Sequence, residues 1–149
     1  MLAATTKLAD NPEPEKQGGY LTAIQIYPRI ISLQCQIGVV HPEKRDEYRG
    51  LSMKGASRLL AHPTHASSWQ SRDHANKRWG GAIRSNNWVF SLSGPPEKMA
   101  EAVVTAVSYH LQLIIIRDVD FIASLSDNPS IRTLLSLNPA HFPGWANTE

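Results

Sequence analysis

The sequence has a single cysteine, Cys35, among 149 residues, which excludes a fold held together by internal disulfides. It also lacks a long apolar run. Leu113 to Ile116, the run that stands out, is far shorter than the roughly 20 residues that cross a bilayer. The first residues do not contain the apolar core of a signal peptide. These features predict a soluble, cytoplasmic protein without a membrane partner.

Two further absences limit the classes of function that the sequence supports. The formal net charge is only +2, so bulk charge does not indicate a polyanionic partner. The glycine-rich patterns that bind phosphate groups are missing, and no recognisable catalytic signature is present. The sequence therefore predicts no cofactor and favours a binding protein over an enzyme. The length and the 42% share of hydrophobic residues are typical of about one folded domain.

Four stretches before residue 93 predict β-structure. Apolar and polar residues alternate from Ile31 to Val39, which predicts a strand with one face on a core, and Cys35 lies in the apolar phase as a buried thiol. Tyr20 to Tyr27 is rich in β-forming residues and predicts a preceding strand. Ala82 to Arg84 and Trp88 to Leu92 flank a turn with two asparagines, which predicts a hairpin.

The clearest helix is predicted over about residues 95–111, where prolines begin an apolar stripe at helical spacing. A shorter helix is predicted over Ser52 to Ala61, after a charged loop at Glu43 to Glu47. Leu113 to Ile116 is β-branched and predicts a central strand, with a continuation of the helix as the alternative. Short helices are predicted in the C-terminal part.

These elements predict one α+β domain over residues 19–149, with the main helix packed on a mixed or antiparallel sheet. Residues 1–18 are polar and proline-containing, which predicts a flexible N-terminal arm. Residues 62–81 show neither helical nor strand periodicity. They predict a long basic and aromatic loop, and loops of that length are often functional.

The segment 58–88 is the candidate functional surface. It contains three of the four tryptophans, three of the six histidines, and five cations against one acid, Asp73. Cations beside aromatic rings can hold a polyanion, and tryptophan and arginine are enriched at protein interface hot spots. The predicted binding side chains are Arg58, Trp69, Arg72, His74, Lys77, Arg78, Trp79 and Arg84.

The segment 58–88 is compatible with more than one kind of partner. The favoured hypothesis is a non-catalytic protein that uses this segment to bind another protein or a second copy of itself, as a homo-oligomer. The polar row of Ser32, Gln34 and Gln36 would also allow an edge strand to pair with a second chain. The alternative is nucleic-acid binding by the same segment, because tryptophan stacks on bases and cations neutralise phosphates.

A third hypothesis is a metal-dependent hydrolase. His62, His65 and His74 are candidate ligands, because imidazoles are common transition-metal ligands, although three solvent-facing loop histidines and no bound metal are favoured. Asp118 and Asp120 follow the predicted strand and could present two carboxylates to a cation. The favoured interpretation is that these aspartates cap a turn or lie on the surface.

Overall fold

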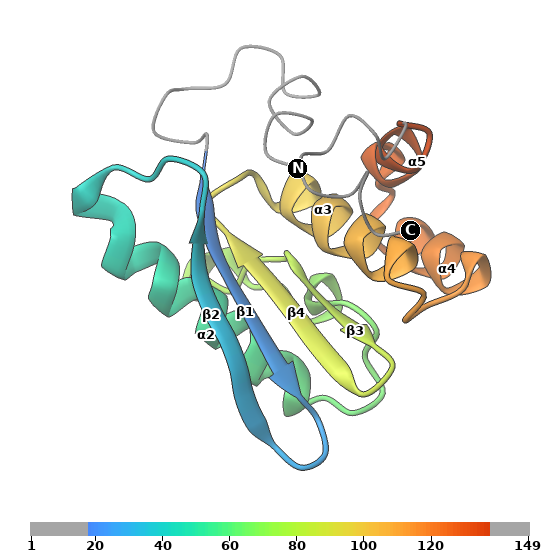
Figure 1. The fold of residues 1–149 in the computed structure, drawn as a ribbon, viewed down its shortest axis with the longest axis horizontal. Helices are drawn as coiled ribbons and strands as arrows, with labels where there is room; N and C mark the ends of the chain where they lie inside the picture. Colours follow the sequence, from blue (N-terminus) through green and yellow to red (C-terminus); the bar gives the residue numbers. More distant parts are fainter. Residues whose placement is uncertain (1–17, 138–149) are drawn as a thin grey trace, which may run out of the picture.

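The computed structural model describes residues 18–137 of the chain (Figure 1). The predicted flexible arm over residues 1–18 lies outside the described residues, except for Gly18. Four strands form one antiparallel sheet in the order β2-β1-β4-β3, and helices lie on both sides of it. The strands are β1 (Gly19–Gln25), β2 (Ile30–Ile37), β3 (Ala82–Ser85) and β4 (Trp88–Ser93). The predicted α+β class is confirmed.

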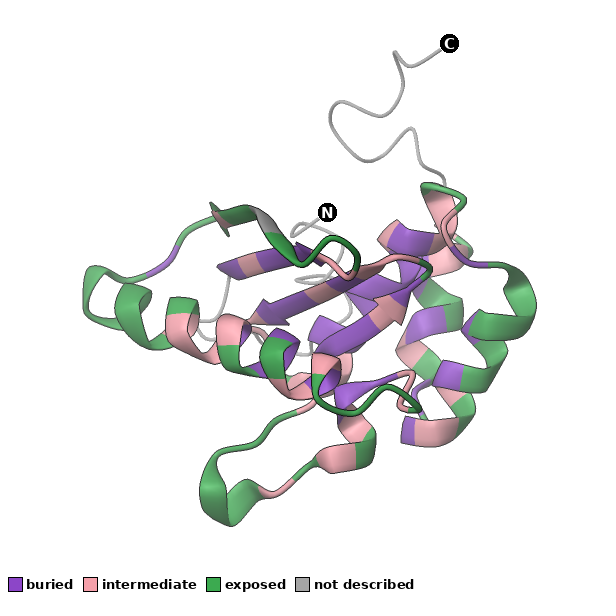
Figure 2. Ribbon diagram, turned by 90° about the horizontal axis from the view of Figure 1, so that it is seen from below, coloured by how far each residue is buried: buried purple, intermediate pink, exposed green. Residues whose placement is uncertain are grey.

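One helix covers one face of the sheet, and a group of three lies on the other side (Figures 1 and 2). The first is α2 (Arg45–Leu60), and the group is α3 (Glu97–His110), α4 (Ile116–Ser126) and α5 (Pro129–Leu135). The predicted main helix and the short C-terminal helices are confirmed in this group. None of the described helices is long and apolar enough to cross a membrane.

The two faces of the sheet bury two separate sets of side chains. Because side chains alternate along a strand, neighbouring residues point to opposite faces. Ile24 and Val89 pack against Leu59 on the α2 side, whereas Ile83 and Leu92 pack on the α3 side. Each fully buried side chain of this size contributes about 1.5–3 kcal/mol to stability. The sheet is therefore held between two hydrophobic clusters, which appear as buried ribbon in Figure 2.

Helix α2 approaches the sheet closely because small residues form its inner face. Ser52 and Gly55 are buried, and a Cβ atom at Gly55 would lie 2.7 Å from Ser91 Oγ. The hydroxyl groups of Ser52 and Thr22 hydrogen-bond at 2.7 Å, which satisfies both inside the interface. A larger side chain at position 55 would separate the helix from β4.

The same interface explains one incorrect prediction. The structure has no charged loop at residues 43–47. Those residues form a short 3₁₀ turn, η2 (Pro42–Lys44), and the first turn of α2, which begins at Arg45 rather than at Ser52. A helix that packs through serine, glycine and alanine has no stripe of large apolar residues, so its first half resembles a solvated loop in the sequence.

The predicted central strand at Leu113 to Ile116 is also wrong. This run connects α3 to α4, after Gln112 has adopted a left-handed backbone with φ of 61°. Ile114 is buried in the α3-side cluster, whereas Ile115 is 59% exposed. Asp118 Oδ2 accepts a hydrogen bond from the Ile115 amide at 3.0 Å and fixes the start of α4.

Strand β2 is correctly predicted, but its apolar phase does not lie on a core. Leu33 is 45% exposed and Cys35 is partly buried, so the predicted core position of the thiol is wrong. The physical reason is that α3 packs on β3 and β4 and does not extend over β2 at the sheet edge.

Candidate binding site

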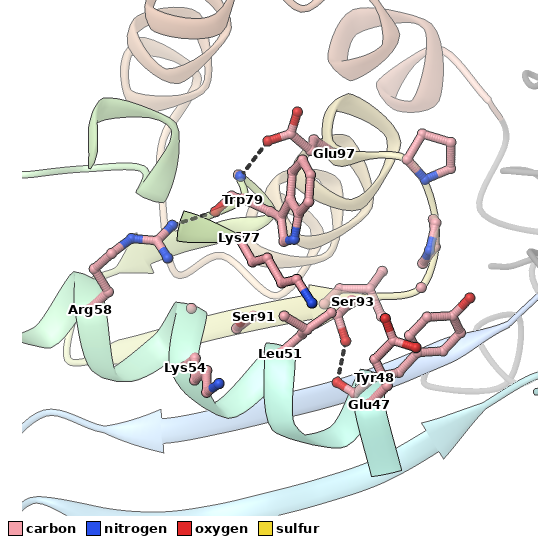
Figure 3. Close-up of a pocket in the computed structure, with 16 residues that line it drawn as sticks. Glu47, Tyr48, Leu51, Lys54, Arg58, Lys77, Trp79, Ser91, Ser93 and Glu97 are labelled. Atoms are coloured by element: carbon pink, nitrogen blue, oxygen red, sulfur yellow. Dashed lines mark hydrogen bonds between the residues drawn. The ribbon is translucent and has the colours of Figure 1, made fainter. Parts of the chain in front are cut away.

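Part of the segment 58–88 lines a cleft of about 410 Å³ between α2 and the N-terminus of α3 (Figure 3). Figure 3 shows Lys77 and Trp79 on one wall and Leu51 and Lys54, both from α2, on the other. The end of β4 and the turn at residues 94–96 close the remaining side. This volume is within the range of pockets that hold small ligands or a few side chains of a partner.

Glu97, the first residue of α3, fixes one end of the segment. Its Oε1 atom accepts a hydrogen bond from the Gly80 amide at 2.8 Å. Its Oε2 atom lies 3.1 Å from His74 Nε2 and 3.7 Å from Arg72 Nη1. A carboxylate in the first turn of a helix is also favoured by the helix dipole. One side chain therefore positions the backbone of the segment and compensates the charge on Arg72.

The other end of the segment is fixed by a buried carboxylate. Glu101 is fully buried and accepts hydrogen bonds from Ser67 Oγ at 2.5 Å, from Asn128 Nδ2 at 3.1 Å and from Ser126 Oγ. Ser67 caps the 3₁₀ turn η3 (Ser68–Ser71) that follows it. The chain between Ser67 and Gly80 is thus attached to α3 at both ends.

Arg58 of α2 connects the helix to the segment through neutral oxygen atoms. Its Nε donates to Ser71 Oγ at 2.8 Å, and its Nη2 donates to the Ser68 carbonyl at 3.4 Å and to the Trp79 carbonyl. A guanidinium holds its donors in a rigid fork, so these bonds define the position of the Trp79 backbone.

The positive charge on Arg58 is not matched by these acceptors. Partial burial lowers the pKa of Arg58, the nearby Arg78 lowers this pKa further, and Glu97 raises it in part. Arginine nevertheless stays protonated at neutral pH. The guanidinium is therefore a positive group whose surroundings favour the approach of an anion.

Two lysines add to the positive charge of the cleft. Lys54 and Lys77 are exposed cleft residues, and within residues 18–137 neither forms an ion pair. Of the two acids on the cleft wall, Glu47 pairs with Lys44 at 3.0 Å, and Glu97 has the partners described above. The cleft is therefore positive on balance.

Lys77 is presented by a tight turn. Asp73 and Arg78 exchange two backbone hydrogen bonds, of 2.9 and 2.8 Å, around the 3₁₀ turn η4 (His74–Asn76). Lys77 closes that turn with a left-handed backbone, at φ of 55°. Non-glycine residues seldom adopt this conformation, and asparagine tolerates it better than most. The Arg78 side chain is exposed beside the cleft.

Trp79 is the exposed aromatic residue of the cleft. The residue is 37% exposed, and its ring lies 4.7 Å from the His74 ring, tilted by 38°. Tryptophan with one face available and its backbone fixed is the kind of residue that dominates the energetics of protein interfaces.

Trp69 has a different position. The Arg72 guanidinium lies 3.5 Å from the centre of its ring, as a cation–π contact. A Cβ atom at Gly80 would come within 2.8 Å of Trp69 Cε3, so the absence of a side chain there admits the ring. Arg72 and Gly80 therefore occupy the surface of Trp69 that a base or a partner would need.

Arg84 does not face the cleft. Its guanidinium donates to the carbonyl groups of Leu59 at 2.7 Å, His65 at 3.1 Å and His62 at 3.2 Å. Leu59 lies in the last turn of α2, and His62 and His65 lie in the chain that follows the helix. Burial also lowers the pKa of Arg84. Its evident role is to hold the chain after α2.

The three candidate histidine ligands do not meet. His62 and His65 stack on each other at 4.7 Å after the end of α2, and His62 Nδ1 lies 2.7 Å from the Arg58 carbonyl. His74 lies beside Glu97 and Trp79 instead. Throughout residues 18–137, no group of three or more histidine, cysteine or acidic side chains is arranged to hold a metal ion.

The two candidate aspartates also have separate contacts. Asp118 caps the start of α4, and Asp120 Oδ1 pairs with Arg132 Nη2 at 2.5 Å. Both lie in a helix rather than after a strand, so the alternative of two carboxylates at a strand end is wrong. The cap at Asp118 and the exposed position of Asp120 fit the favoured interpretation.

Sequence reasoning missed Lys54 and Glu97 among the cleft residues. Lys54 lies inside the helix predicted over Ser52 to Ala61 but before the segment 58–88, and only the packing of α2 beside that segment places it on the cleft wall. Glu97 was visible as an acid in a helical first turn, but its contacts with Gly80 and Arg72 depend on the path of the intervening loop. Comparison of the chain with protein-family models, with curated proteins and with solved structures gave no match.

Proposed function

We propose that this chain is a non-catalytic binding protein that holds an acidic segment of a partner protein in the cleft between α2 and α3. The observation that carries the proposal is the set of three cations, Arg58, Lys54 and Lys77, beside the exposed face of Trp79. Carboxylates of a partner would meet positive groups that form no ion pair within residues 18–137.

The rigidity of the cleft supports the proposal. Arg58 and Glu97 fix the backbone on both sides of Trp79, through the Trp79 carbonyl and the Gly80 amide. A prearranged site loses less conformational entropy on binding, so more of the interaction energy appears as affinity. The cleft would therefore bind a short peptide segment without reorganisation.

The size and chemistry of the cleft favour a peptide over nucleic acid. Proteins that bind single strands usually stack successive bases on several aromatic rings. Here Trp79 has an accessible face, whereas Trp69 is covered by Arg72 and packs against Gly80. A cleft of about 410 Å³ accommodates a few side chains rather than a tract of nucleotides.

The test is fluorescence polarisation with two labelled probes, a glutamate-rich peptide with one aromatic residue and an oligothymidine of similar charge. We expect the peptide to bind more tightly than the oligonucleotide. Lys77→Asn keeps the left-handed turn and removes a charge, and Lys54→Gln removes the facing one. Together these changes should weaken peptide binding about tenfold or more, since each lost exposed pair costs up to about 1 kcal/mol.

The matched control is Arg117→Gln, which removes an exposed cation from α4, outside the cleft. It should leave the affinity unchanged apart from a small effect of net charge. Stronger binding of the oligonucleotide would replace the proposal with nucleic-acid binding. Equal loss of affinity in the control would show that net charge, rather than the cleft, attracts the peptide.

A further inference from the structure

The two edges of the sheet differ in how they are covered. At the β3 edge, Ser67 bridges to Ile83, the Arg84 amide donates to the Ala66 carbonyl at 2.8 Å, and the Ala82 amide donates to Ser68 Oγ. Residues 66–68 therefore cover the free backbone of β3. At the other edge, the backbone of β2 from Leu33 to Ile37 has no such hydrogen bond with a described segment beyond β1.

Strand β2 also lacks most of the features that prevent an edge strand from pairing with a strand of another chain. Edge strands are usually protected by charged residues, by proline, by a bulge or by a short length. The eight residues of β2 contain neither a charged residue nor a proline. One register shift occurs opposite Ala23 and Ile24, near the β1–β2 turn, and the ladder from Leu33 to Ile37 is regular.

Three apolar side chains of this regular part form a row that is partly exposed among residues 18–137. Leu33, Cys35 and Ile37 lie on the sheet face that α3 covers farther along, over β3 and β4. Leu33 is 45% exposed, and Cys35 and Ile37 are partly buried. On the opposite face, Gln34 Nε2 donates to the Arg49 carbonyl of α2 at 3.3 Å, so α2 reaches that side of β2. Within residues 18–137, the α3 group packs on β3 and β4, so the face that carries Leu33, Cys35 and Ile37 is the one open to a neighbour (Figures 1 and 2).

We infer that β2 pairs with β2 of a second copy of this chain, in antiparallel orientation about a two-fold axis. A strand without charge is complementary to itself, because no like charges oppose each other across such an axis. The pairing would join two four-stranded sheets into one and bring the two apolar rows together.

A second copy of the chain fits this edge because the edge offers no charge for an unlike partner to complement. The cleft, in contrast, is lined by three cations, so the charged cleft and the uncharged edge suit different partners. Pairing through β2 would also leave the cleft accessible, since none of its lining residues belongs to β2.

The regular ladder is centred on Cys35, which would place the two copies of Cys35 opposite each other at the axis. Directly opposed residues of an antiparallel pair have Cα atoms about 4.5–5.5 Å apart. That separation is within the roughly 4.4–6.8 Å that a disulfide spans. Because the chain has one cysteine, any disulfide-linked dimer must join Cys35 to Cys35.

The experiment combines light scattering of the full chain with mild oxidation. We expect twice the mass of the chain at micromolar concentration, and rapid conversion to a disulfide-linked dimer that Cys35→Ser abolishes while the scattering mass stays double. Leu33→Lys should weaken the dimer at least tenfold, because the symmetry introduces the charge twice. Circular dichroism would verify that this variant is folded.

The matched control is Leu111→Lys, which places the same change at a residue 57% exposed after the end of α3. It should leave the dimer intact. A chain that scatters as a monomer up to high micromolar concentration would overturn the inference, as would a dimer that resists oxidation at Cys35. The oxidation arm needs no destabilising variant, so the inference remains testable if Leu33→Lys does not fold.

Discussion

Removal of the Glu97 carboxylate should loosen the segment between η3 and β3. In Glu97→Ala, the Gly80 amide loses a charged acceptor at 2.8 Å, and Arg72 and His74 lose their common partner. The structure thus predicts a local defect on the cleft wall rather than a general loss of packing.

The magnitude follows from the three contacts. A hydrogen bond to a charged group contributes about 1.5–3 kcal/mol. The pairs with His74 and Arg72 are 51% and 31% exposed on the cationic side, so each contributes at most about 1 kcal/mol. Because these terms share one carboxylate they do not add fully, and we expect about 2–3 kcal/mol for Glu97→Ala. Glu97→Gln keeps an acceptor for the Gly80 amide and should cost about half as much.

The assay is urea denaturation together with amide hydrogen exchange over residues 68–80. Exchange should accelerate in that segment of Glu97→Ala by about tenfold or more and change little in β1. The matched control is Glu47→Ala, because Glu47 also lines the cleft and lies in a helical first turn, but within residues 18–137 its ion pair is an exposed one with Lys44. If Glu97→Ala were as stable as Glu47→Ala, with unchanged exchange at residues 68–80, the assignment of Glu97 as the anchor would be refuted.

Three further variants test other parts of the structure. Gly80→Ala would place a methyl group 2.8 Å from Trp69 Cε3, so the ring must move, and we expect an altered near-ultraviolet circular dichroism signal and weaker binding of the acidic peptide. Glu101→Ala would remove the acceptor that three buried side chains share; Ser126 and Asn128 keep a backbone acceptor, whereas Ser67 Oγ loses Glu101, which should lower the free energy of unfolding in urea by about 1–3 kcal/mol. Burial lowers the pKa of His110 below its ordinary value of 6.5, so the unfolded chain binds the proton more readily, and the stability of the fold falls as the pH drops below about 6.5. In His110→Gln, the loss of stability between neutral and mildly acidic pH should be smaller than in the unmodified chain; an identical pH dependence would contradict this assignment.

Helices and strands that are marked by a regular apolar pattern or by a turn signal in neighbouring residues could be predicted from the sequence. The α3 helix follows from its prolines and apolar stripe, and the β3–β4 hairpin from two asparagines between β-forming runs. Both depend on contacts between residues close in the chain. Helix α2 was predicted too short because its residues 45–51 include charged side chains and none that is buried, so they carry no hydrophobic signal.

Part of the segment that composition singled out lines the cleft, although no pattern in the sequence predicted a cleft. The charged and aromatic composition of the segment 58–88 indicated a surface, and Arg58, Lys77 and Trp79 do line one cleft. Composition could not reveal that Arg84 points to the carbonyl groups after α2, because that depends on where β3 lies relative to the helix. Nor could the alternation in β2 reveal whether α3 reaches far enough to cover Leu33.

The measurement that tests the central claim most directly is a heteronuclear NMR titration of the full chain with the glutamate-rich peptide. We expect the largest shifts at the Trp79 indole N–H and at the amides of Lys77, Gly80 and the facing turn of α2, with saturation at one peptide per chain. Shifts spread over unrelated surfaces, or concentrated away from the cleft while the Trp79 indole remains unchanged, would contradict the account.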